Sequence, residues 1–78
     1  MTINGEQVRR ARNLLGLTRL QLADKSRVSL ATVKKMETGV AEPKLFYILA
    51  IQHALEAAGV SFIEENGEGP GVRLRKGK

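Results

Sequence analysis

Hydrophobic residues in the first 59 positions recur at the spacing of α-helices rather than of β-strands. The first helix is predicted from about Asn4 to Leu15, because Val8 and Ala11 fall on one face of it. Gly16 follows directly, and a glycine just after the last periodic residue is a typical helix end. The chain therefore begins with one amphipathic helix.

Two short helices are predicted next, and only residues 26–28 separate the end of one from the cap of the other. The first has Thr18 as its N-cap and runs to about Lys25. The second has Ser29 as its N-cap and runs from Leu30 to about Thr38. Two short helices joined by so tight a turn are typical of helix-turn-helix geometry.

The longest helix is predicted from about Lys44 to Ala58, with Gly59 as its end. It carries two apolar stripes, and a helix that is apolar on more than one face must bury more than one face. The first stripe consists of Leu45, Ile48, Gln52 and Leu55. The second stripe, which we interpret as a candidate dimer interface, consists of Tyr47, Ile51, Ala54 and Ala58.

The pattern changes to a period of two after this helix. Val60 and Phe62 alternate with Ser61 and Ile63, residues 72–75 alternate strictly between apolar and polar side chains, and residues 66–71 form a cluster of turn residues. This combination predicts a C-terminal β-hairpin, which is marginal in water on its own. Pairing with a second subunit would relieve that weakness, and the sequence leaves open whether the strands pair within or between subunits. The hairpin adds three dimer-interface candidates, Phe62, Val72 and Leu74.

These elements give one small, mainly α domain with a short C-terminal β-hairpin. Within it, residues 1–59 form the helix-turn-helix part and residues 60–78 a C-terminal dimerisation tail. The chain has 78 residues, no cysteine and a single histidine, His53. We therefore expect no disulfide, no metal site and no cofactor. A core of this size is often stabilised by oligomerisation, which favours a homodimer.

The net charge of +5 is unevenly distributed along the chain. Residues 1–44 carry nine basic and four acidic side chains, residues 45–72 carry four acidic and no basic ones, and residues 73–78 carry four basic ones. A basic N-terminal half favours binding to a polyanion, chiefly nucleic acid. The longest apolar run has seven residues, far short of a membrane span, and no signal segment is visible. We expect a cytoplasmic protein without a membrane partner.

Residues 17–39 and their surroundings resemble the lambda repressor/Cro-like helix-turn-helix family, also called the XRE family. The motif positions that carry the resemblance are Ala11, Arg12, Leu17, Thr18, Leu22, Ala23, Val28, Ser29, Ala31, Thr32, Val33, Glu37, Thr38 and Gly39. The similarity extends through the fourth helix, and the tail is similar to that of small stand-alone members ending in a strand pair. The resemblance implies a lambda-repressor-like bundle of about four helices.

The resemblance also implies roles for individual residues. The second short helix would be the recognition helix, with four residues facing the DNA bases: Leu30, Ala31, Lys34 and Lys35. Residues that would contact phosphates or flank the groove are Thr18, Arg19, Arg27, Ser29, Thr38 and Lys44. Arg12 and Glu37 occupy positions that form a structural ion pair in the family.

Three positions depart from the family pattern. Arg19 replaces the usual Gln, and Ser26 stands where an apolar residue is usual. Arg27 replaces the usual Gly of the turn, where a left-handed backbone would strain any other residue. Both arginines add positive charge beside the predicted groove-facing surface, which fits DNA binding.

The sequence thus predicts a sequence-specific transcription regulator that binds double-stranded DNA. We expect an autoregulatory repressor acting as a homodimer on a near-palindromic operator. Small members of the family often serve bacterial mobile genetic elements, and no pattern of catalytic residues indicates an enzyme. The alternative is an adaptor with a protein partner, such as an antitoxin or antiactivator, which could bind at the open strand edge.

Overall fold

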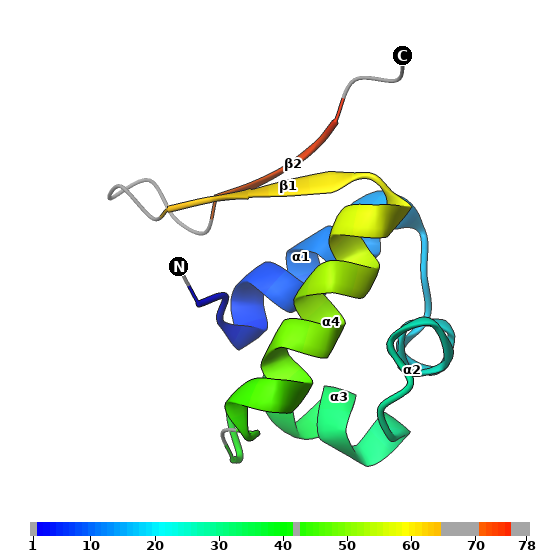
Figure 1. The fold of residues 1–78 in the computed structure, drawn as a ribbon, viewed down its shortest axis with the longest axis vertical. Helices are drawn as coiled ribbons and strands as arrows, with labels where there is room; N and C mark the ends of the chain where they lie inside the picture. Colours follow the sequence, from blue (N-terminus) through cyan, green and yellow to red (C-terminus); the bar gives the residue numbers. More distant parts are fainter. Residues whose placement is uncertain (1, 42, 65–70, 76–78) are drawn as a thin grey trace.

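A computed structural model describes residues 2–41, 43–64 and 71–75. It contains four helices and one two-stranded antiparallel sheet, which confirms the predicted mainly α fold with a C-terminal hairpin (Figure 1). The elements are α1 (Gly5–Leu15), α2 (Arg19–Ser26), α3 (Leu30–Thr38), α4 (Leu45–Ala58), β1 (Val60–Ile63) and β2 (Gly71–Leu74).

The helices begin and end where their capping residues predict. The side chains of Asn4, Thr18 and Ser29 accept hydrogen bonds from backbone N–H groups in the first turns of α1, α2 and α3. Gly16 and Gly39 end α1 and α3 in the left-handed conformation, with φ of 71° and 74°. Local side-chain chemistry therefore sets the boundaries of the first three helices.

The core lies between α4 and the three helices before it. Six side chains are fully or almost fully buried, and each contributes about 1.5–3 kcal/mol of burial free energy. They are Val8, Leu22, Val33, Ile51, Leu55 and Val60. They come from all four helices and from β1, so one continuous core holds the helix-turn-helix, the long helix and the hairpin together.

The buried line of α4 runs between the two stripes that the sequence suggests. Ile48, Ile51 and Leu55 are buried, whereas Leu45 of the first stripe is 57% exposed. Ile51 is wholly inside the protomer, so including it in a dimer interface was wrong. The physical reason is that α4 packs on the other elements through a single face, which takes residues from both stripes.

The hairpin pairs β1 with β2 of the same chain, with Val60 opposite Leu74 and Phe62 opposite Val72. It lies across α1 at the end of the molecule away from α3 (Figure 1). Phe62 and Val72 are half-buried against the core, while Leu74 is 49% exposed. The core of the protomer thus uses much of the apolar surface that we assigned to dimerisation. Of the turn cluster, residues 66–70 lie outside the described residues.

Gln7 joins the first helix to the end of the hairpin where Ile63 pairs with Gly71. Its side chain is buried, and its amide nitrogen donates to the carbonyl oxygens of Ile63 (3.4 Å) and Gly71 (3.3 Å). Its amide oxygen accepts from the backbone nitrogen of Asn4 at 3.0 Å. A Cβ on Gly71 would overlap the backbone of Ile63, so this close pairing requires glycine.

The Gln7 bonds can be tested against a matched residue, because Gln21 makes the same capping bond in α2, at 2.9 Å, on an exposed surface. Gln7→Leu should lower the free energy of unfolding by about 1–3 kcal/mol, since it leaves buried hydrogen-bonding groups without partners. Gln21→Leu should cost less than about 1 kcal/mol. Urea denaturation followed by circular dichroism measures both. Equal losses would show that the bonds to the hairpin add nothing.

Candidate nucleic-acid interface

The turn between α2 and α3 has the left-handed residue that the sequence predicts. Arg27 has φ of 61°, and no other non-glycine residue in the described chain has a positive φ. Its backbone N–H donates to the carbonyls of Ala23 and Asp24 and closes the end of α2. A side chain in this conformation costs about 1–2 kcal/mol. The folded chain therefore holds an arginine in a strained backbone conformation at the turn.

Ser26 shows how a polar residue fits the apolar position before this turn. Its side chain is buried, and its hydroxyl donates to the carbonyl oxygen of Leu22 at 2.7 Å. A buried hydroxyl with a partner avoids the free-energy cost of an unsatisfied polar group. The departure from the family pattern therefore leaves the helix-turn-helix geometry intact.

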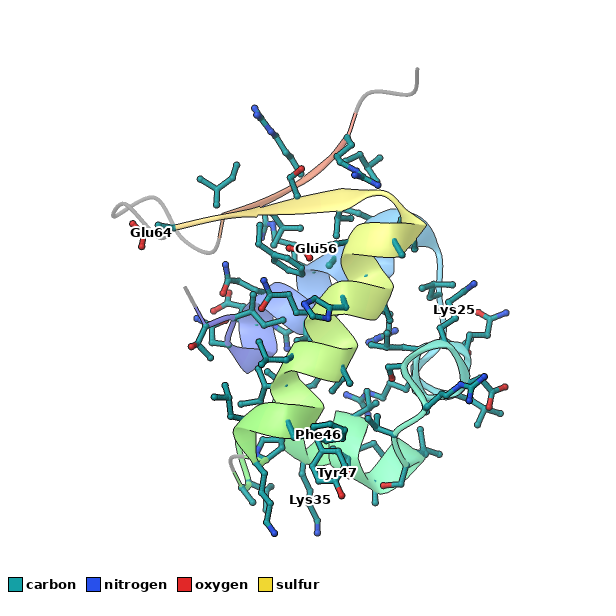
Figure 2. All side chains as sticks on the ribbon, in the orientation of Figure 1. Lys25, Lys35, Phe46, Tyr47, Glu56 and Glu64 are labelled. Atoms are coloured by element: carbon teal, nitrogen blue, oxygen red, sulfur yellow. The ribbon has the colours of Figure 1, made fainter. Side chains whose placement is uncertain are left out.

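Helix α3, the predicted recognition helix, divides into a buried and an exposed face. Val33, Met36 and Glu37 face the core. The four residues that we assigned to base reading, Leu30, Ala31, Lys34 and Lys35, are all exposed. Figure 2 shows Lys35 extending from the α3 end of the molecule, away from the hairpin. The fold thus gathers these side chains on one open surface with a positive charge.

The flanking polar residues lie around this face in different roles. Thr18 and Ser29 are exposed caps, and each hydroxyl accepts a backbone N–H at 3.0 Å. The hydroxyl of Thr38 donates to the carbonyl oxygen of Lys34 at 2.8 Å, within its own helix. Lys44 is exposed at the start of α4 and makes no capping bond through its side chain.

A buried carboxylate ties the first three helices together. Glu37 on α3 accepts from Nε (2.8 Å) and Nη2 (3.0 Å) of Arg12 on α1. Its Oε1 also accepts from Nε of Arg19 on α2 at 3.0 Å. The Glu37 side chain is 0% exposed, while the side chains of Arg12 and Arg19 are 14% and 35% exposed. Arg12 further donates to the carbonyl oxygen of Leu17 at 3.0 Å.

The arginines keep Glu37 ionised despite its burial. Desolvation alone would raise the pKa of Glu37, but the hydrogen bonds and charges of Arg12 and Arg19 lower it more, so the pKa lies below its ordinary value. The hydrogen bond to Glu37 likewise raises the pKa of Arg12, against the effect of burial. A neutral carboxyl would leave two guanidinium groups without their counter-charge.

The pair between Arg12 and Glu37 is the one that the family resemblance implies, but the part played by Arg19 was missed. From the sequence, Arg19 is predicted only to contact DNA. Arg19 and Glu37 lie on separate helices, so no helical spacing reveals their contact, which depends on how α2 packs on α3. The ion pair occupies Nε of Arg19 and fixes the direction of a guanidinium that is still one-third exposed.

The basic hairpin residue Arg75 also has a structural partner. Its guanidinium donates to the carbonyl oxygen of Glu56 at 2.8 Å, and its backbone N–H donates to that of Gly59 at 2.7 Å. A cation at this position satisfies the last turn of α4 and interacts favourably with the helix dipole. Arg73 on β2 is exposed. One of the two described arginines of the tail, Arg75, therefore stabilises the end of α4.

The fold and this exposed basic face define a helix-turn-helix domain of the DNA-binding class. A helix-turn-helix family model matches residues 8–64, and the chain belongs to that lambda repressor/Cro-like family, XRE, of DNA-binding regulators. No curated protein matches the sequence closely enough to be counted as a relative.

None of the helices in the described parts of the chain has both the length and the apolar character to cross a bilayer. In the same residues, no three histidine, aspartate or glutamate side chains lie together in a way that could hold a metal ion.

The Glu37 network predicts acid sensitivity. A carboxyl group whose pKa is lower in the folded than in the unfolded chain stabilises the fold at neutral pH, and this stabilisation is lost as pH falls below the ordinary pKa of 4.5 toward the folded value. The free energy of unfolding, measured in urea at a series of pH values, should therefore decline over that range. Glu37→Gln should show a weaker decline than Glu6→Gln, an exposed control. An identical decline in both variants would contradict this account.

The strain at Arg27 predicts that Arg27→Gly raises the free energy of unfolding by up to about 1 kcal/mol, because glycine adopts positive φ without a Cβ clash. Lys25→Gly is the matched control: it also removes one positive charge, but from a helical residue. It should lower the free energy of unfolding by about 1 kcal/mol. Thermal denaturation of both variants tests the difference. A destabilised Arg27→Gly protein would mean that the arginine side chain stabilises the turn.

Proposed function

We propose that this protein is a sequence-specific transcriptional repressor that binds a near-palindromic operator as a homodimer. The observation that carries the proposal is the exposed face of α3, which presents two lysines and two apolar side chains, with Arg19 at the start of α2 and Arg27 in the turn before α3. Such a helix fits the major groove, whose width admits one α-helix.

Each side chain on the exposed face of α3 has a chemical role in this proposal. Lys34 and Lys35 donate hydrogen bonds to O6 and N7 of guanine, the acceptors that the major groove presents. Leu30 and Ala31 make apolar contacts with thymine methyl groups. Because only these groups read base edges, the specificity of the protein resides in the four residues.

The flanking residues hold the protein on the DNA backbone. Arg27 and Lys44 contribute charge on either side of α3, and Thr18 and Ser29 lie at the N-termini of α2 and α3, where N–H groups favour phosphate. Arg19 contributes a guanidinium that Glu37 orients. Thr38 is a weaker candidate, because its hydroxyl already donates to Lys34.

Regulation follows from occupancy of the operator. A two-fold dimer places its recognition helices in successive major grooves, about 34–36 Å apart. Bound at a promoter, including that of its own gene, the dimer blocks polymerase. Residues 1–59 supply the DNA-binding part of the domain, and residues 60–78 form its tail.

Selection from a random duplex DNA library by the purified full chain, at low and at moderate salt, tests the proposal. We expect an enriched motif with two-fold symmetry and half-site centres about one helical turn apart. Binding that disappears with rising salt and enriches no sequence would contradict it, because phosphate contacts alone carry no sequence information. That result would favour the alternative of an adaptor with a protein partner.

Titration of the selected duplex then tests the assigned residues. Lys34→Ala and Lys35→Ala should each weaken binding by about 1–3 kcal/mol and relax specificity at one position. Arg27→Gly should weaken binding to all sequences and reduce the salt slope by about 1. Arg73→Ala removes an equal charge on the hairpin and should have little effect. If the α3 variants bind as tightly as the unaltered protein, α3 is not the recognition helix.

A further inference from the structure

The side of α4 opposite its buried line is also apolar. We call this side the outer α4 face, and it comprises Phe46, Leu49, Ala50, His53 and Ala57. Phe46 is 76% exposed and Leu49 is 38% exposed, and Ala50 is half-buried. Figure 2 shows Phe46 at the end of α4 that adjoins α3. A helix that is apolar all round is normally buried all round, so this face lacks a partner in the protomer.

Charge distinguishes the outer α4 face from the rest of the surface. Glu56 is the one charged side chain among residues 45–58, and it accepts a hydrogen bond from Gln52 of the same helix at 3.2 Å. Residues 1–44, in contrast, carry nine lysines and arginines. Two copies of a chain with a net charge of +5 repel each other, and they approach with least repulsion through this uncharged face.

We infer that the outer α4 face binds the same face of a second copy of this chain, with the two α4 helices antiparallel. The inference rests on the homodimer in the proposed function and identifies its interface. In an antiparallel pair centred between Ala50 and His53, Phe46 lies opposite Ala57 of the other copy, and Ala50 lies opposite His53. Phe46 and His53 thus each meet an alanine, which is the self-complementarity that a two-fold interface requires.

The position of the helix-turn-helix selects the antiparallel arrangement. Tyr47 shares a surface hollow with Thr32 and Lys35 of α3, and Ala54, Ala57 and Ala58 share another with Lys25 of α2. Both α2 and α3 therefore lie along one side of α4, as Figure 1 shows.

A two-fold axis perpendicular to α4 keeps both recognition helices on that side, where one duplex can contact them. An axis parallel to α4 would turn them to opposite sides. Tyr47 lies beside α3, and Ala54 and Ala58 are half-buried beside α2, so they are poorer interface residues than Ala57, which is exposed at the edge of the same hollow.

Engineered cysteines test the register, because the natural chain contains none. In the Phe46→Cys/Ala57→Cys variant, the two cysteines of one helix are too far apart to bridge, since eleven residues of α-helix span about 16 Å. Oxidation should therefore convert most of this variant to covalent dimer. Leu20→Cys/Ala57→Cys is the control and should remain mostly monomeric. Equal cross-linking of the two variants, or stronger cross-linking of Phe46→Cys alone, would overturn the antiparallel arrangement.

Sedimentation equilibrium of the full chain tests the face itself. The unaltered protein should have the mass of a dimer, Phe46→Glu that of a monomer, and Val40→Glu, changed at a residue 77% exposed outside the face, that of a dimer. Circular dichroism verifies that each variant is folded. An unaltered protein that is monomeric, or a Phe46→Glu protein that is still dimeric, would overturn the inference. These measurements contain no DNA, so a dimer that selects no duplex would refute the proposed function and leave the interface standing.

Discussion

The ion pairs of the buried Glu37 carboxylate are the interaction on which the helix-turn-helix arrangement depends. The carboxylate accepts hydrogen bonds from an arginine on α1 and another on α2 while lying on α3, so one charge sets the mutual positions of three helices. Breaking a buried pair leaves an uncompensated charge and costs about 3–5 kcal/mol. Because Arg19 is both bound to this carboxylate and partly exposed, the network that holds the bundle together also orients a cation beside the recognition helix.

One close approach of the backbone and one buried side chain complete this arrangement. A Cβ on Gly5 would overlap the carbonyl oxygen of Met36, so glycine lets the start of α1 lie directly on the end of α3. Gln7, one half-turn further along α1, binds both strands of the hairpin. The first helix therefore connects α3 at one end of the molecule with the sheet at the other.

Most of the fold follows from local signals in the sequence, because caps, glycine stops and hydrophobic spacing act over a few residues. The limits of α3 and the role of Ser29 illustrate this. Contacts between elements were harder to foresee. The rotation of α4, which buries Ile51, depends on what packs against it, and the bond from Arg19 to Glu37 depends on the crossing of two helices. The interface that we propose therefore lies on the outer α4 face, which neighbours the stripe that the sequence suggests.

We propose that DNA lies against α3 and the start of α2, at the end of the molecule opposite the hairpin. Amide chemical-shift changes in the labelled protein, recorded while a selected duplex is added, test it most directly. The account predicts the largest changes at residues 18–19, 27–35 and 44, and small changes in β1 and β2. Changes concentrated in the two strands, with α3 unaffected, would contradict it.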